Sequence, residues 1–201
     1  MFEQTLAIIR NTFFESIRQP VMLVMLVVAS LLIIFANVVS GYTMSDDQKM
    51  FIDMGLATVF ICGAILAAFV ATSVLGREIE NRTALTVISK PVSRPLFVLG
   101  KYFGVAAALA LATIFMSVVF LMVEQHSVLQ TSRDPVHVPV ILFGLGAAAI
   151  GLGVGVWCNY FYNRVFTSTV ICVTTPLLIL AYVLSLMFKA DFTPQPMAAA
   201  I

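Results

Sequence analysis

Few side chains in the sequence are of types that carry out chemistry. The only two histidines, His126 and His137, belong to one polar loop and form no H-E-x-x-H zinc motif. The three cysteines, Cys62, Cys158 and Cys172, lie in apolar stretches without C-x-x-C spacing, which favours packing over metal or redox chemistry. A G-x-x-x-x-G-K-[ST] phosphate loop is absent as well. The sequence therefore predicts no catalytic residue, no metal site and no cofactor, so that this chain by itself is not an enzyme.

The composition is that of a chain surrounded by lipid. Hydrophobic residues make up 61% of the 201 residues, charged residues make up 10%, and the mean hydropathy is +1.04. Soluble domains are about half apolar and about one quarter charged, and a chain of this length could not bury such an excess in one core. We therefore predict an all-α membrane protein in which residues 1–201 form one transmembrane domain, with the lipid bilayer and not nucleic acid as its surroundings.

Five stretches are long and apolar enough to cross a bilayer, since about 20 helical residues span a hydrocarbon core of about 30 Å. The predicted spans are residues 21–39, 55–75, 102–123, 138–157 and 165–188. No Asp, Glu, Lys or Arg lies in their central turns, where one charge costs roughly 2.5–3.5 kcal/mol on insertion. Channels and ion-coupled transporters place ionisable residues there, so this pattern counts against both classes.

Residues 1–19 predict an amphipathic helix that lies in the membrane interface, as an elbow before the first span. Apolar residues recur there at steps of three and four: Leu6, Ile9, Phe13 and Ile17. Pro20 should end this helix and turn the chain into the bilayer. The N-terminal region lacks the short, basic form of a signal peptide, so we expect the first span to be retained as an anchor.

Basic residues are divided unevenly between the two sides that these spans create. One side holds eight of the eleven lysines and arginines: Arg10, Arg18, Arg77, Arg82, Lys90, Arg94, Lys101 and Arg164. The other side holds Lys49, Arg133 and Lys189. Because short loops rich in Lys and Arg stay in the cytoplasm, we predict a multi-pass protein of the cytoplasmic (inner) membrane whose N-terminus and residues 77–101 are cytoplasmic.

Two features of the later spans concern helix packing. Gly151 and Gly155 form a small-xxx-small pair, which lets helix backbones approach closely in lipid. Packing inside the subunit is the favoured interpretation, and a translocation path or a dimer interface is the alternative. In the fifth span Pro176 predicts a kink, and the hydroxyls of Thr174 and Thr175 can satisfy the carbonyl that it frees.

The loop of residues 77–101 is the most informative segment. Charges of alternating sign at its start are followed by a short apolar patch, which comprises Ala84, Leu85, Val87 and Ile88. The pattern predicts a short amphipathic helix that ends near Pro91. Ser93 is suited to cap the next helix, with Pro95 in its first turn. A compact segment of this kind can transmit motion from a cytosolic partner, but an ordinary basic loop with an interfacial helix has the same pattern.

This loop, REIENRTALTVISKPVSRPLFVLGK, resembles the signature loop of the type-2 ABC transporter permease family, and IIRNTFFESIRQPV resembles the elbow helix of that family. The matching loop positions are Glu80, Thr83, Pro91, Ser93, Arg94, Gly100 and Lys101. Arg82 is a departure, because the family has Gly at that position. The resemblance extends from residue 1 to about residue 190. Family members have six spans or more, whereas the sequence predicts a bundle of five. The bundle has six if a further span follows the apolar residues 198–201.

The resemblance implies a membrane-spanning permease subunit that moves substrate when a separate subunit hydrolyses ATP. It implies a homodimer, or a heterodimer with a second permease, and docking of a coupling helix onto a cytosolic ATP-binding subunit. The implied docking residues are Glu78, Glu80, Arg82, Thr83, Leu85, Pro91, Ser93, Arg94 and Lys101. A membrane anchor or scaffold that transports nothing is the alternative, because it would share the docking loop.

Overall fold

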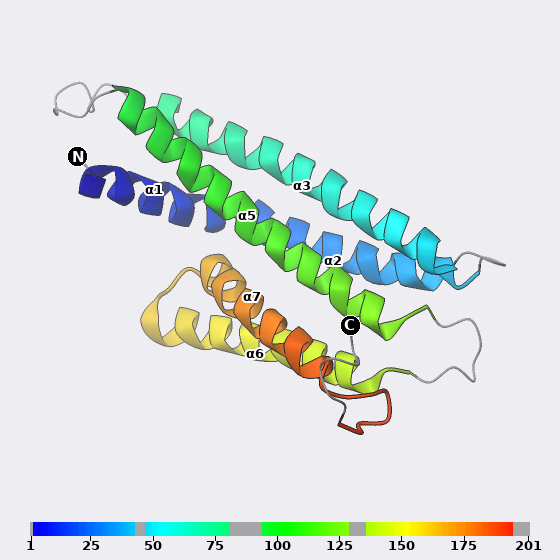
Figure 1. Ribbon diagram of the computed structural model, residues 1–201. Helices are drawn as coiled ribbons and strands as arrows, with labels where there is room; N and C mark the ends of the chain where they lie inside the picture. Colours follow the sequence, from blue (N-terminus) through cyan, green and yellow to red (C-terminus); the bar gives the residue numbers. More distant parts are fainter. Residues whose placement is uncertain (1, 43–46, 81–93, 129–135, 195–201) are drawn as a thin grey trace.

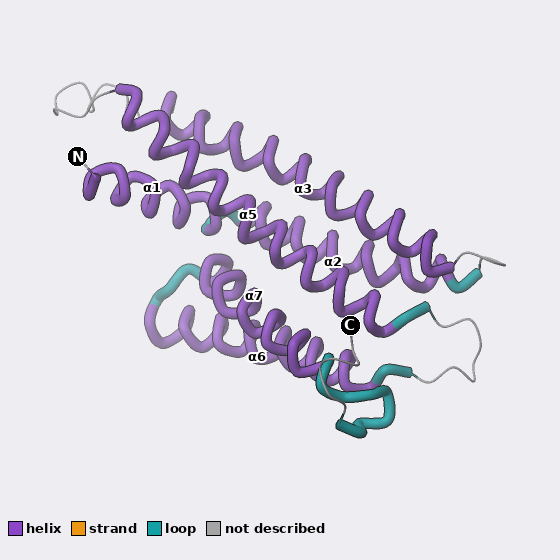
Figure 2. Tube along the Cα trace, viewed as in Figure 1, coloured by secondary structure: helices purple, strands orange, loops and turns teal. Residues whose placement is uncertain are grey.

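The computed structural model describes residues 2–42, 47–80, 94–128 and 136–194. These residues form six helices and contain no β-strand (Figures 1 and 2). The helices are α1 (Phe2–Ile17), α2 (Pro20–Ser40), α3 (Asp47–Glu80), α5 (Arg94–His126), α6 (Val138–Tyr162) and α7 (Phe166–Ser185). The predicted all-α class is therefore confirmed for the described residues.

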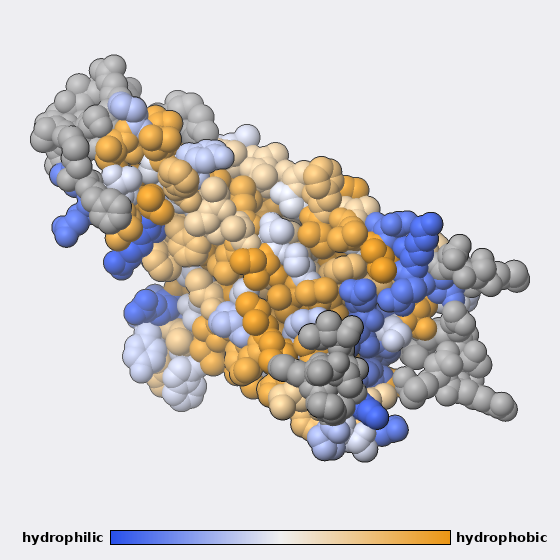
Figure 3. Space-filling view, in the orientation of Figure 1, coloured by the Kyte–Doolittle hydropathy of each residue, from blue (hydrophilic) through white to orange (hydrophobic). Residues whose placement is uncertain are grey.

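Five of these helices, α2, α3, α5, α6 and α7, are long and apolar enough to cross a membrane, and each overlaps one predicted span. The surface in Figure 3 is hydrophobic across its middle, and hydrophilic residues gather at two ends. Large apolar side chains are exposed, among them those of Phe60 with 77% and Phe35 with 62% of the surface exposed. A protein with this surface would aggregate in water, whereas lipid solvates it. By length and composition the chain is a multi-pass helical membrane protein.

Helices α3 and α5 extend further than the sequence predicts. They contain 34 and 33 residues, which corresponds to about 50 Å each at 1.5 Å per residue. The ends of the predicted loop, Arg77–Glu80 and 94–101, are therefore helical. Arginine and glutamate are good helix formers, and Pro95 lies in the first turn of α5, where its missing N–H costs nothing. At the other end of the chain α7 stops at Ser185 rather than at residue 188.

Helix α1 lies along the first part of α5, and it runs in the same general direction as α2 (Figure 1). The helical conformation is interrupted between α1 and α2 at Gln19, whose backbone is extended, and Pro20 is the first residue of α2. This arrangement does not show an elbow helix turned across the spans. The position of residues 1–19 in the membrane interface stays a prediction.

The buried face of α1 contains part of its predicted apolar stripe, since Ile17 is fully buried and Ile9 and Phe13 are partly buried. Leu6 is 56% exposed, whereas Thr12 and Ser16 are buried. The Ser16 hydroxyl donates to the carbonyl of Thr12 at 2.9 Å, so its polar group is satisfied inside the helix. Small side chains take these two positions because α5 approaches α1 closely there.

The packing divides the helices into two groups. Helices α1, α2, α3 and α5 share one core, and its buried residues include Ile17, Leu26, Leu66, Ala112 and Met116. Helices α6 and α7 form an antiparallel hairpin that packs mainly on itself (Figure 2). A second cluster, with Val118, Ala147 and Leu178, joins this hairpin to α5. Helix α5 therefore makes most of the contact between the two groups, and Ile171 of α7 also belongs to the first core.

Candidate functional site

The predicted docking residues belong to the end of α3, to the first part of α5, or to the segment 81–93, which lies outside the described residues. Arg82, Thr83, Leu85, Pro91 and Ser93 lie outside the described residues. Glu78 and Glu80 belong to the last turn of α3, and Arg94 begins α5. The described structure thus brings the two helices that flank residues 81–93 to one end of the molecule (Figure 1).

Lys101 lies on α5 at the contact with α1. Its ammonium nitrogen is 5.1 Å from the centroid of the Phe97 ring, within range of a cation–π interaction. The charge of Glu15 on α1 also acts on it. Lys101 is half-buried, so these interactions tie its side chain to the α1–α5 pair.

Gly100 and Gly104 bring α1 and α5 into close contact. A Cβ atom added at Gly100 would lie 2.9 Å from a methyl carbon of Ile8. One added at Gly104 would lie 2.6 Å from the Cβ of Thr12 and 2.8 Å from the carbonyl oxygen of Ile9. The two glycines are four residues apart and face one helix, which is the small-xxx-small geometry that membrane helices use to pack. We call α1 together with residues 94–104 of α5 the stalk.

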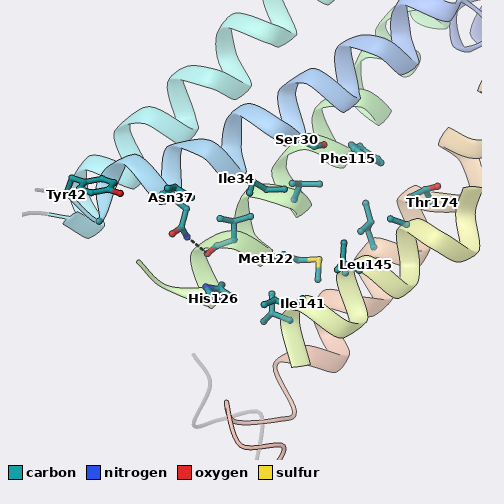
Figure 4. A pocket seen from close by; sticks show the side chains of 18 residues that line it. Ser30, Ile34, Asn37, Tyr42, Phe115, Met122, His126, Ile141, Leu145 and Thr174 are labelled. Atoms are coloured by element: carbon teal, nitrogen blue, oxygen red, sulfur yellow. Dashed lines mark hydrogen bonds between the residues drawn. The ribbon is translucent and has the colours of Figure 1, made fainter. Parts of the chain in front are cut away.

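An open groove of about 800 Å³ lies between α2 and α5 on one side and α6 and α7 on the other (Figure 4). Its walls are mainly apolar, and they include Ile34, Val119, Met122, Leu145, Ala148 and Leu178. Three polar residues, Asn37, Tyr42 and His126, line it near the ends of α2 and α5, and we call this end the mouth. The groove therefore has an apolar body and a polar mouth.

The amide of Asn37 joins the two helices at the mouth. Its Nδ2 donates to the carbonyl of Val123 at 3.3 Å and to that of Ser127 at 3.2 Å. These carbonyls belong to the end of α5, where no following turn supplies donors. In the body of the groove the Ser30 hydroxyl donates to the Leu26 carbonyl at 2.7 Å. The amide donors of Asn37 and the hydroxyl of Ser30 are thus used within the protein.

Gly151 and Gly155 lie at the contact between α6 and α7. A Cβ atom at Gly151 would collide with the side chain of Thr174, and one at Gly155 would collide with Val170. The Thr174 hydroxyl is buried and has no hydrogen-bond partner in the described structure. Helix α7 continues through Pro176. The Thr175 hydroxyl donates to the carbonyl of Ile171 at 2.7 Å, so it does not serve the carbonyl of Cys172 that the proline leaves free.

His137 precedes α6 and is partly buried. Its Nδ1 is buried and has no hydrogen-bond partner among the described residues. Burial lowers the pKa of His137 below its ordinary value of 6.5, and the charge of His126 lowers it further. The neutral ring is therefore the form that the fold favours.

Acidification from about pH 7.5 to about pH 5, the range in which histidine titrates, should destabilise the end of the molecule where α5 meets α6. Because the folded-state pKa of His137 is depressed, its contribution to stability is complete above pH 6.5 and is lost as the pH falls toward the folded-state pKa. Thermal unfolding of the detergent-purified chain measures this effect. His137→Gln should weaken the pH dependence, and an unchanged profile in this variant would contradict the prediction.

Sequence reasoning missed several residues of this site. Gly104 was not recognised as a packing residue, although Gly100 and Gly104 carry the same spacing as Gly151 and Gly155. Asn37 was not recognised either, and a lone amide near the end of an apolar helix is the signal that could have found it. The groove has no local signal, since its walls come from four helices.

Comparison of the chain with family models, with curated proteins and with solved structures gives no match. The functional conclusions below therefore depend on the sequence pattern and on the geometry of the described residues.

Proposed function

We propose that this chain is the membrane-spanning permease subunit of an ATP-binding cassette transporter, which moves substrate across the cytoplasmic membrane when a separate subunit hydrolyses ATP. The observation that carries the proposal is the course of α5. This helix begins at Arg94, directly after the predicted docking segment, and its far half, from Phe115 to His126, lines the groove. One continuous helix therefore leads from the docking segment to the groove wall.

The stalk supports this role because a lever has to be stiff. Helix α1 packs along the first part of α5, and the close approach at Gly100 and Gly104 leaves little room for the two helices to slide. A force on residues 81–93 would then displace α5 as a body rather than bend its end. In this proposal the N-terminus and residues 77–101 are cytoplasmic, and the chain pairs with itself or with a second permease.

Charge reversal on both sides of the docking segment tests the proposal. Glu80→Lys combined with Arg94→Glu inverts the charges where the segment begins and ends and leaves the net charge unchanged. The wild-type chain should co-purify from detergent with the ATP-binding subunit encoded nearby, and the double variant should lose that subunit while remaining folded. Lys49→Glu combined with Asp53→Lys is a matched control, because it makes the same net-neutral exchange at the start of α3, and it should retain the subunit.

An anchor or scaffold for a cytosolic partner is the second candidate, and co-purification alone does not distinguish it if that partner is the ATP-binding subunit. The two differ in whether the groove moves. In a background without the native cysteines, Val119→Cys reports on the groove, and its labelling by a maleimide should change when ATP is added to the assembled complex. Labelling that is the same with and without ATP favours the anchor. Failure of the wild-type chain to capture an ATP-binding subunit contradicts the permease and favours an anchor for another cytosolic partner.

A further inference from the structure

The groove presents different chemistry along its length. The mouth carries Tyr42, which is 86% exposed, and the imidazole of His126. Because α2 is a span of 21 residues, Tyr42 just beyond its end lies at the level where a bilayer becomes polar. The body of the groove lies deeper and is lined by aliphatic and aromatic side chains. A ligand that fits has a polar head at the mouth and an apolar chain in the body.

Water is a poor occupant of the body. An internal water needs two to four polar partners, and the body of the groove offers few of them. The Ser30 hydroxyl already donates to the Leu26 carbonyl, which leaves the single buried hydroxyl of Thr174 without a partner among the described residues. The volume of about 800 Å³ lies within the range of small-molecule sites. The groove is partly open, and its walls belong to helices that are long and apolar enough to cross a membrane.

We propose that this groove binds one acyl chain of a bilayer phospholipid, with the lipid headgroup beside Tyr42 and His126. The Tyr42 phenol can donate a hydrogen bond to an ester or phosphate oxygen at that level. Nδ1 of His126 lies 3.2 Å from the carbonyl oxygen of Ser127, so this ring donates to a lipid oxygen through Nε2 when that nitrogen is protonated. An apolar helix of a second copy would fill the body but would leave these donors without acceptors, because its backbone carbonyls are used within the helix. The site does not depend on the proposed permease function, since lipid binding requires no ATP-binding subunit.

Photochemical cross-linking tests the site in the full-length chain. The chain is placed in vesicles that contain a phosphatidylcholine with a diazirine in one acyl chain, irradiated, digested and mapped by mass spectrometry. Adducts should be enriched on the groove residues Val119, Leu145 and Leu178 relative to Phe60 of α3, which is 77% exposed and does not line the groove. Equal labelling of the groove and of Phe60 would overturn the proposal, because it would reduce the groove to ordinary lipid-facing surface.

Ala148→Phe fills the groove and should abolish its adducts, while the adducts on Phe60 remain. Ala149→Phe is the matched control, because it makes the same change at the next residue of α6, which is exposed and does not line the groove. Ile34→Trp fills the groove from the opposite wall, so the test survives if Ala148→Phe does not fold. Groove adducts that persist in both filling variants would overturn the proposal. So would Leu145→Cys, if it cross-links to a second copy of the chain in place of lipid.

Discussion

Gly151→Leu should separate α6 from α7 and destabilise the fold by about 2–3 kcal/mol, since overpacking a tight contact costs about that much. Even the first added carbon collides with the side chain of Thr174 and lies 3.2 Å from its Cα, so a change of side-chain rotamer cannot relieve the contact. The free energy of unfolding in mixed detergent micelles measures the effect. The hairpin is held to the remaining helices mainly through α5, so its loosening should also disrupt the groove.

Gly153→Leu is the matched control for this prediction. It makes the same substitution two residues along the same helix, but a Cβ atom at Gly153 meets nothing within 4 Å. Its effect on stability should stay within about 0.5 kcal/mol, as is usual for surface positions. Adding Thr174→Ala to Gly151→Leu should restore part of the loss, because it removes the hydroxyl nearest to the new carbon. Equal destabilisation by the two leucine variants would show that α6 and α7 do not pack as described.

Gly104→Ala should release α1 from α5. The added methyl group would lie 2.8 Å from the Ile9 carbonyl oxygen, so the α1 backbone has to move away. We expect a loss of about 1–2 kcal/mol in the α1–α5 contact, which changes the population of the detached state by a factor of about 5–30. Ser16→Cys, placed in a background without the native cysteines, reports this loss, because Ser16 is fully buried in the intact stalk. Its rate of maleimide labelling should rise by the same factor.

Gly63→Ala provides the comparison for the stalk. A Cβ atom at Gly63 would lie 3.9 Å from the Met116 methyl group, which is an ordinary van der Waals contact. The Ser16→Cys reporter should therefore remain protected in this variant. If Gly104→Ala leaves the reporter protected as well, α1 is not held by α5. If Gly104→Ala releases α1 but the ATPase rate of the bound ATP-binding subunit does not change, the stalk is not the lever that we propose.

The sequence alone was sufficient for the features that depend on neighbouring residues. Five long apolar runs without central charges predicted five membrane helices, because the cost of burying a charge in hydrocarbon acts on each segment separately. It also identified Gly151 and Gly155 as small residues on one face of a helix. Pro20 was recognised as the residue at which the first helix cannot continue, because proline lacks the backbone N–H that a helix interior requires.

The faces that helices turn toward each other were decided by the tertiary structure. In α1 the apolar stripe predicted a helix lying in the membrane interface, and it did not reveal that Thr12 and Ser16 are buried. Thr12 lies against Gly104 of α5, where the two backbones approach closely. Helices that are apolar on all sides carry no amphipathic signal that tells a packed face from a lipid-facing one. Position along the chain likewise does not reveal that Asn37 reaches Val123, 86 residues away.

What the sequence by itself determined is that this chain is helical and crosses a membrane several times. The groove, the stalk and the electrostatic effect of His126 on His137 were decided only by the tertiary structure. Each of them joins residues from different helices, and the free energy of such contacts depends on how closely the backbones approach. That distance is set by the packing of all the helices together, and no single segment contains it.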